Sequence, residues 1–488
     1  MSDLARIGGP VACIGLAVLL TARGRTNRLA GLGYAVVGTL LIVISVAPAK
    51  AGELAAVSGA ALVLAPLLAL LFRFEPWLAA FGTLAFVPLR VGLFGHQLLV
   101  PLYAIALGSA LLLGWQLARG DDRSRELGLV SKPLALFVAW EGFSLAWTVD
   151  VHEGATEILA FYIPFTILAL ALARLPWSAL RLRLLYLELG VMALVFASVG
   201  FYQYETRDIF QNPKVITANA YAAFFRVNSV FWDPSVYGRF LVVALIPTVV
   251  LIVRGRSQRA AIAAFVFMVV AWAGLLISFS QSSFAALLVG VIGVAVVAWR
   301  WKSLIAVGAA VVVLAGIGVS EPKVRHALLH HTTAGLNAAS SGRENLVANG
   351  IRIAFAHPAF GVGVGGFKHA YAERRHLKGL APKIAASHDT PVTVAAESGF
   401  IGLVLMLWLV VALARVSFRR VDRSFAGRVS LGAGLTLAAI FTHSLFYNDF
   451  FEDPTTWGLI ALVALAASRP HTAQEQQPPT ENREPVTA

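Results

Sequence analysis

The chain has little of two things that soluble proteins use freely, which are charge and cysteine. Only 13% of its 488 residues are charged, whereas 58% are hydrophobic, and the mean hydropathy is +0.75. This balance excludes a soluble globular protein and indicates a polytopic membrane protein. The single cysteine, Cys13, lies in an apolar run, so a disulfide framework and a cysteine-rich metal site are both excluded.

Long apolar runs recur along the chain, and each approaches the roughly 20 residues with which a helix crosses a bilayer. They predict an all-α, polytopic membrane helix bundle of 12 to 15 transmembrane helices. We expect N-terminal transmembrane helices (1–203), an extracytoplasmic segment (204–235), transmembrane helices (236–319), a large extracytoplasmic helical loop (320–397), C-terminal transmembrane helices (398–468) and a disordered cytoplasmic tail (469–488).

The net charge of +13 would suit a nucleic-acid partner, but its distribution points elsewhere. Arginine clusters such as Arg23 to Arg28, Arg119 to Arg125 and Arg415 to Arg428 fall in alternate connections, and the short loops of the other set hold little beyond Lys50. By the positive-inside rule the arginine-rich connections are cytoplasmic. The loop from Glu321 to Ala396 is then extracytoplasmic, the expected partner surface is membrane lipid, and no nucleic acid is expected.

That loop holds seven of the eleven histidines. Its first candidate motif is Ser341-Gly342-Arg343-Glu344. The serine and glutamate have capping-box spacing, which predicts a helix that ends at Pro358. Arg343 would lie in the first turn, where its guanidinium and the free N–H groups suit a phosphate, although an exposed surface arginine fits as well. The apolar stripe expected on this helix is Val347, Ile351 and Phe355.

Gly361, Gly363 and Gly366 have dinucleotide-fingerprint spacing, but no strand precedes them, so we expect a tight turn that returns the chain to the membrane. The basic residues that follow, from Lys368 to Lys383, are typical of a solvated face near anionic lipid headgroups. His326, His330 and His331 have spacing that a metal could use, but no carboxylate or cysteine partner is evident. No metal site is therefore predicted.

His388 lies where the loop re-enters a helix, just before Thr390 and Pro391, which form a plausible N-cap and N1 pair. An imidazole there can act as a general base, with Asp389 or Glu397 to orient it or tune its pKa. A structural histidine at a helix start is the alternative reading.

The other extracytoplasmic segment carries Arg226, Asp233 and Arg239 immediately before a span, and Arg90 interrupts an earlier apolar run. Ionisable residues at the edge of the hydrocarbon are costly, so they pair with one another or serve a buried polar site. For Arg239 we favour pairing or snorkelling. Arg226 and Arg90 stay open on physical grounds.

Taken together, these motifs resemble the family of O-antigen ligases and the related O-antigen polymerases. The similarity extends from about Ser144 to Leu413. It is carried by Ser-Gly-Arg343, His-Pro358, Gly-Val-Gly-Val-Gly, a histidine and Glu-Ser-Gly-Phe-Ile-Gly402, with Arg226, Asp-Pro234 and Ser144-Leu-Ala-Trp-Thr-Val-Asp150 upstream.

The resemblance implies a glycosyltransferase of GT-C type that takes a glycan from a polyprenyl (undecaprenyl) diphosphate carrier. It joins the glycan to an acceptor hydroxyl of a glycan or glycolipid at the outer face of the cytoplasmic membrane, without a cofactor or metal and with inversion. Arg343 and Arg226 would hold the diphosphate, and His388 would take the acceptor proton. Asp389, Glu397, Arg239, Arg90 and Asp233 would contribute to substrate binding.

Two positions depart from the family pattern. Ser283 stands where members commonly carry an arginine, which puts one donor contact in doubt, and Asp389 stands where an asparagine often follows the histidine. A carboxylate beside His388 would favour the imidazolium.

Two other functions stay open. A polymerase that extends lipid-linked repeats would use similar residues, whereas a flippase or transporter predicts charged residues near the middle of the spans rather than in one loop.

Overall fold

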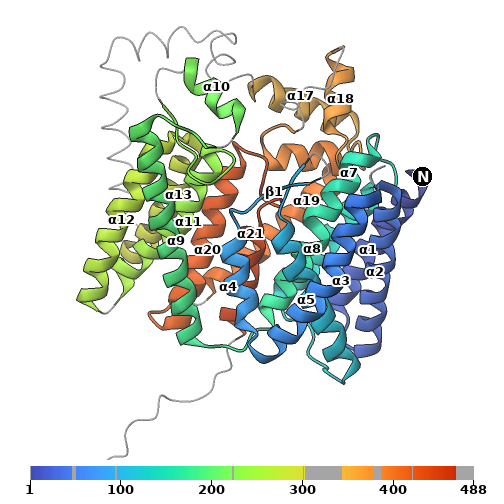
Figure 1. Ribbon diagram of the computed structural model, residues 1–488, viewed down its shortest axis with the longest axis horizontal. Helices are drawn as coiled ribbons and strands as arrows, with labels where there is room; N and C mark the ends of the chain where they lie inside the picture. Colours follow the sequence, from blue (N-terminus) through green and yellow to red (C-terminus); the bar gives the residue numbers. More distant parts are fainter. Residues whose placement is uncertain are drawn as a thin grey trace, which may run out of the picture.

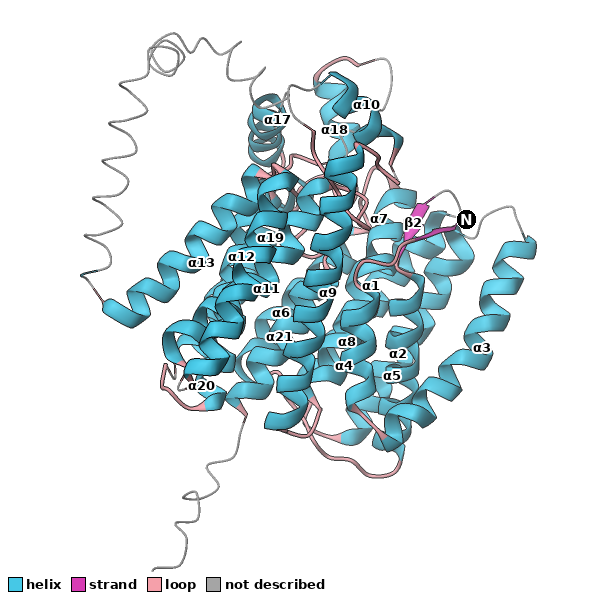
Figure 2. Cartoon of the chain, turned by 60° about the vertical axis from the view of Figure 1, so that its left-hand side comes forward, coloured by secondary structure: helices cyan, strands magenta, loops and turns pink. Residues whose placement is uncertain are grey.

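The computed structural model shows a bundle of long helices that run roughly parallel to one another (Figure 1, Figure 2). The structure describes residues 2–46, 51–93, 96–210, 212–221, 225–255, 257–300, 302, 343–377, 386–419 and 421–468. Ser341 with its predicted cap, the three histidines near position 330, the apolar run 303–319 and the tail from 469 lie outside the described residues.

The first half of the bundle consists of α1 (Ser2–Thr21), α2 (Arg25–Val46), α3 (Ala51–Phe74), α4 (Trp77–Phe86), α5 (Val100–Ala118), a 3₁₀ turn (Gly128–Val130), α6 (Ser131–Ser144), α7 (Val151–Glu157), a π-helical turn (Ile158–Tyr162) and α8 (Ile163–Ala173). The second half consists of α9 (Ala179–Thr206), α10 (Pro213–Tyr221), α11 (Pro234–Arg254), α12 (Gln258–Ser278), α13 (Gln281–Trp299), α17 (Arg343–Ala356), α18 (Phe367–Arg374), α19 (Thr390–Phe418), α20 (Phe425–Ser444) and α21 (Pro454–Ala467).

Ten helices in the described part of the chain are long and apolar enough to cross a membrane, and three shorter apolar helices accompany them. The prediction of a polytopic helix bundle is confirmed, while the predicted 12 to 15 spans exceed the ten that the described residues hold. One of the ten is the continuous rod Val151–Ala173, which contains α7, the π turn and α8.

The apolar run at 77–96 is not a single span. Helix α4 ends at Phe86, and the strands β1 (Val91–Leu93) and β2 (His96–Leu98) then form a short antiparallel hairpin. Pro88 has no N–H to continue a helix. Arg90 therefore lies at the start of the hairpin. The expectation that it interrupts a membrane-spanning run is wrong.

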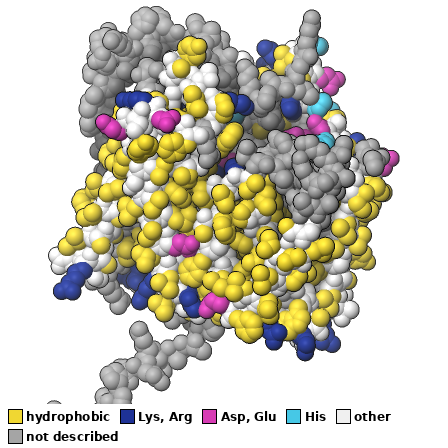
Figure 3. Space-filling model, in the orientation of Figure 1, with side chains coloured by type: hydrophobic (Ala, Val, Ile, Leu, Met, Phe, Trp, Pro, Cys, Tyr) yellow, Lys and Arg dark blue, Asp and Glu magenta, His cyan; other side chains and the backbone are white. Residues whose placement is uncertain are grey.

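The bundle has two chemically different ends. The arginine-rich end collects Arg25, Arg73, Arg123, Arg174, Arg181, Arg254 and Arg419, which lie at or beside helix termini. The other, the α17 end, carries α10, α17 and α18 and the N-termini of α11, α13, α19 and α21 (Figure 1). A broad hydrophobic band separates the charged groups of the two ends in Figure 3. This arrangement agrees with the alternation of basic connections in the sequence.

Helices α1 and α2 pack with their backbones almost in contact. A Cβ atom on Gly15 would lie 2.5 Å from the Ala35 nitrogen and the Gly31 oxygen, and one on Gly38 would lie 2.2 Å from the Ala12 nitrogen. Small residues are what allow such close approach between helices in a membrane, where packing contacts replace the hydrophobic effect.

Gly38→Ala is expected to lower thermal stability, because its methyl group would overlap the Ala12 main chain. Overpacking of this kind costs about 1–3 kcal/mol. Gly33→Ala is the matched control, since nothing lies within 4 Å of its Cβ position on the same helix. Thermal unfolding of both variants in detergent is the measurement, and equal midpoints would contradict the close α1–α2 contact.

Candidate functional site

Arg226 lies in the connection between α10 and α11, and its position is fixed from both sides. Its main-chain N–H donates to Asn219 Oδ1 (3.0 Å), and the Asn219 amide donates to its carbonyl (2.9 Å). Its Nε donates to the Ser278 carbonyl at the end of α12 (3.2 Å). Burial lowers the pKa of Arg226, the nearby Arg343 charge lowers it further, and Asp233 opposes both. Arg226 is thus a partly desolvated cation close to Arg343.

Arg343 lies in the first turn of α17 as the structure describes that helix, whereas its predicted serine cap lies outside the described residues. The helix is held against the start of α19 through Gly350, whose Cβ position lies 2.6 Å from Val392 Cγ1. The predicted apolar stripe is wrong, because Ile351 and Phe355 are exposed. The buried face consists of Leu346, Asn349, Gly350, Ile353 and Ala354. This rotation follows from packing on α19, which needs the small Gly350 at the contact.

His388 is held in the left-handed region at φ +61°, which few non-glycine residues adopt. Its neighbours enforce this conformation. Ser387 Oγ donates to the Asp389 carbonyl (2.8 Å) and shares a hydrogen bond with Thr393 Oγ1 (2.8 Å). Strained backbone of this kind persists only where its surroundings determine it, and it is common at functional sites.

Asp389, rather than Thr390, is the N-cap of α19, so Thr390 and Pro391 occupy the first two helical positions. The Asp389 carboxylate accepts from the Val392 N–H at 2.9 Å. Burial raises the pKa of Asp389, while this hydrogen bond lowers it. One oxygen of its carboxylate therefore serves as a helix cap, and the expected role of Asp389 in tuning His388 stays a prediction.

Glu397 has a structural role, because it holds the segment that follows the glycine turn against α19. It is buried two turns further along α19 and accepts from the Phe367 N–H at 3.0 Å. Together with Glu141, Glu157 and Glu452 it lines a small cavity of about 30 Å³, which is room for about one water molecule. Glu397 lies seven residues, about 10 Å at 1.5 Å per residue, beyond the start of α19 at Thr390, and its expected role beside His388 stays a prediction.

The connection between α20 and α21 contains candidate site residues that were not predicted from the sequence. The Tyr447 ring lies edge-on to His388, with centroids 6.2 Å apart, and is tilted against His443 at 5.8 Å. Burial raises the pKa of Tyr447. The polar run Tyr447-Asn-Asp449 and Glu452-Asp453-Pro454 between two spans was the available signal.

Arg239 is buried and paired, as favoured from sequence, rather than free to bind substrate. Its Nη1 contacts Asp449 Oδ2, and its Nε lies 2.9 Å from Asp453 Oδ2. His443 Nδ1 lies 3.7 Å from Asp449 Oδ1. The two ion pairs of Arg239 join α11 to the α20–α21 connection, which also carries Tyr447.

Asp233 and Arg90 frame the same region. Asp233 caps α11 by accepting from the Ser235 N–H at 2.7 Å, and its charge acts on Arg226 and Tyr447. Arg90 is exposed, and its charge acts on Tyr447 and Glu452. Both predicted residues therefore surround the Arg226, Arg343 and His388 group without forming its centre.

Ser283, which stands where an arginine is common in the family, is fully buried. Its hydroxyl lies 2.8 Å from Ser280 Oγ and 2.7 Å from the Cβ position of Gly238. An arginine would not fit this tight contact. Arg226, which bonds the carbonyl of neighbouring Ser278, is the cation that this region presents.

The glycine turn after α17 fastens the candidate site to the membrane bundle. Gly361, Gly363 and Gly365 all have positive φ, and their Cβ positions would lie 2.2–2.4 Å from the backbone of α19, of Thr148 and of α7. The Val362 and Gly363 N–H groups donate to carbonyls that α19 frees where it breaks at Gly399. The predicted tight turn is thus confirmed, although Gly365 rather than Gly366 has the third positive φ.

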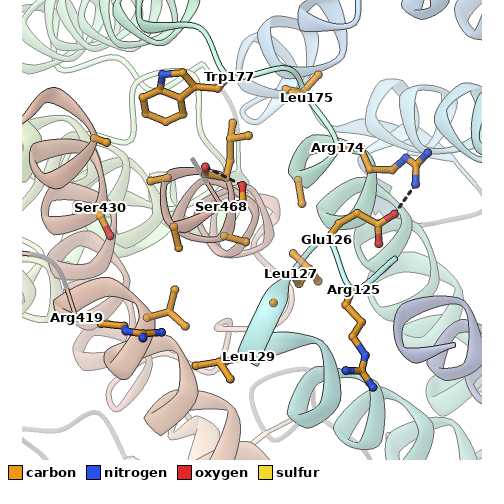
Figure 4. A pocket seen from close by; sticks show the side chains of 18 of the residues that line it. Arg125, Glu126, Leu127, Leu129, Arg174, Leu175, Trp177, Arg419, Ser430 and Ser468 are labelled. Carbon is orange, nitrogen blue, oxygen red and sulfur yellow. Dashed lines mark hydrogen bonds and ion pairs between the residues drawn. The ribbon is translucent and has the colours of Figure 1, made fainter. Parts of the chain in front are cut away.

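A cavity of about 1090 Å³ lies at the arginine-rich end, away from these residues (Figure 4). It is lined by Arg125, Trp177 and Arg419 and by Glu126 with its partner Arg174. Because it shares no residue with the Arg226 and His388 group, we do not assign it to the same chemistry.

Among residues 2–468 that the structure describes, no three histidine, cysteine, aspartate or glutamate side chains converge as a metal site. The three-histidine spacing near position 330 is untested, because those residues are outside the described ranges.

The fold and the site define a multi-pass membrane protein with two arginines, a strained histidine and a tyrosine gathered at one end of its helix bundle. Residues 264–407 match the protein family described as O-Antigen ligase. The matched residues are similar to this family, and the resemblance found in the sequence is confirmed over them. The match includes Arg343 and His388, and it supports a glycosyltransferase-like role in glycan transfer during O-antigen assembly. No curated protein sequence matches the chain.

Arg239→Met is expected to destabilise the protein by about 3–5 kcal/mol, because two buried carboxylates lose this cationic partner. Adding Asp449→Asn removes one stranded charge and should restore part of the loss. Arg259→Met, at an exposed arginine, is the control. Thermal unfolding in detergent is the measurement. If the single and double variants melt alike, the ion pair does not hold the α20–α21 connection.

Proposed function

We propose that this protein transfers a glycan from a polyprenyl diphosphate carrier to an acceptor hydroxyl, as an O-antigen ligase does. The observation that carries the proposal is the gathering of Arg226, Arg343 and His388, from three distant segments, at one end of a membrane bundle. Because the opposite end is arginine-rich, the positive-inside rule supports an extracytoplasmic location for this group at the cytoplasmic membrane.

The two arginines suit the donor. Guanidinium groups pair bidentately with phosphate oxygens, and Arg343 adds the free N–H groups of a helix N-terminus. When the glycosidic bond to the carrier breaks, negative charge grows on the diphosphate that leaves. Two cations held in place before the reaction stabilise that charge without reorganisation. The charges of Arg226 and Arg343 act on each other unfavourably, and an anion bound between them would relieve that repulsion.

His388 suits the acceptor. Its imidazole takes the proton of the acceptor hydroxyl while the oxygen attacks the anomeric carbon from the face opposite the diphosphate, which inverts that centre. Tyr447 packs against the ring and limits its orientation. The apolar helices around the α17 end accept the prenyl chain, and the reaction as drawn requires no metal.

Replacing Arg343 or His388 with alanine is expected to lower glycan transfer in proteoliposomes by about 10²–10⁴-fold, the usual size of a general-base or electrostatic contribution. Arg352→Ala and His376→Ala are controls, since both residues are exposed in the same loop region. Arg343→Lys should recover only part of the activity, because lysine keeps the charge but not the bidentate geometry. The proposal fails if Arg343→Ala and His388→Ala both transfer glycan at the wild-type rate.

A polymerase that joins lipid-linked repeats would use the same chemistry with a second lipid-linked glycan as the acceptor. The purified protein is expected to leave a lipid-linked repeat unchanged when that is its only substrate, and to transfer it once a glycolipid acceptor is added. Gel analysis of the lipid-linked products separates the two functions. Chain extension without the added acceptor would identify a polymerase.

A further inference from the structure

A second cavity, of about 590 Å³, lies at the α17 end beyond the C-terminus of α17. Three segments form it: the connection after α6, the glycine turn and α18. Its lining includes Trp147, His357, Gly361, His369, Glu373 and Leu377. The volume is within the range of small-molecule sites. None of these residues belongs to the group formed by Arg226, Arg343 and His388.

One wall of this cavity is a tryptophan whose ring plane is fixed. Trp147 Nε1 donates to the Phe360 carbonyl (3.1 Å), and the indole lies edge-on to the rings of Phe360 and Phe143 at 5.5 and 5.6 Å. Trp140 packs on it at 5.7 Å. The indole is therefore a rigid apolar surface that remains partly accessible at the cavity.

Among the described residues that line the cavity, the others offer hydrogen-bonding groups and include no arginine or lysine. The His369 Nε2 lies 3.0 Å from Asp150 Oδ2, which holds the imidazole in place. His357 and Glu373 are exposed at the cavity. A carboxylate accepts hydroxyl protons well but repels phosphate, so the lining disfavours an anionic lipid headgroup or the diphosphate.

We propose that this cavity is a carbohydrate-binding subsite, which holds sugar units distant from the reacting bond. A sugar ring has an apolar C–H face that makes dispersion contacts with an indole, and a rim of hydroxyls for the carboxylate and imidazoles. The 14 residues of α17 separate the cavity from Arg343 by about 20 Å, at 1.5 Å per residue. A glycan of several units bound at the diphosphate spans that distance. This inference rests on the proposed function.

The test uses full-length protein in nanodiscs and glycans released by mild acid from the lipid-linked material of the source cells, fractionated by length. Calorimetric titration is expected to show binding that Glu373→Gln weakens about tenfold, since hydrogen bonds to a charged carboxylate are stronger than those to a neutral amide. Trp147→Phe, which keeps an aromatic ring, should weaken binding similarly. Both should raise KM for long donors and leave kcat unchanged. Glu205→Gln, at an exposed carboxylate of the same end, is the matched control.

Unchanged binding and unchanged KM in both Glu373→Gln and Trp147→Phe would overturn the subsite. So would displacement of the glycan by anionic phospholipid vesicles that bind the same residues, which would identify a lipid site. Arg343→Ala separates the two proposals, because it should abolish transfer and keep glycan binding. If the wild type binds glycan in a Glu373-dependent way but transfers none, the subsite stands and the proposed transfer function falls.

Discussion

The ion pairs of Arg239 with Asp449 and Asp453 are the interaction on which the candidate site depends. Arg239 lies on α11, a helix that is buried along most of its length, where a charge without a partner would be very costly. Its partners belong to the α20–α21 connection, which also carries Tyr447. The position of Tyr447 against His388 is therefore supported by an electrostatic requirement near the start of α11, in addition to the ring contact itself.

The α17 end separates two kinds of chemistry along one short helix. Arg343 begins α17 near the other cation, Arg226, whereas the turn after α17 leads to a cavity with Trp147 and Glu373. Positive charge suits a diphosphate, and an aromatic wall with a carboxylate suits neutral sugars. A rigid helix between them fixes their spacing, so that one long ligand with a charged head and an uncharged body fits both.

The sequence predicts features that depend on local chemistry. Spans follow from apolar length, the helix after Arg343 from its periodicity up to Pro358, and the turn from its glycines. Features that depend on tertiary contacts were missed or wrong. The buried face of α17 is set by Gly350 against Val392, and the cap of α19 is Asp389 because the Ser387 and Thr393 network holds the preceding backbone. The partner of Arg239 lies more than two hundred residues away, so spacing alone gives no sign of it.

The glycine turn also has a consequence for the biosynthesis of the protein. Thr148 donates to the Val364 carbonyl of the turn, while Glu397 binds the Phe367 N–H at its other side. The turn is thus clamped between a segment made early in translation and a helix that emerges near the end. Until α19 has left the ribosome and entered the membrane, half of this clamp is missing. The candidate site therefore cannot assemble during synthesis of the helices that precede α19, and it forms only once α19 and the α20–α21 connection are in place.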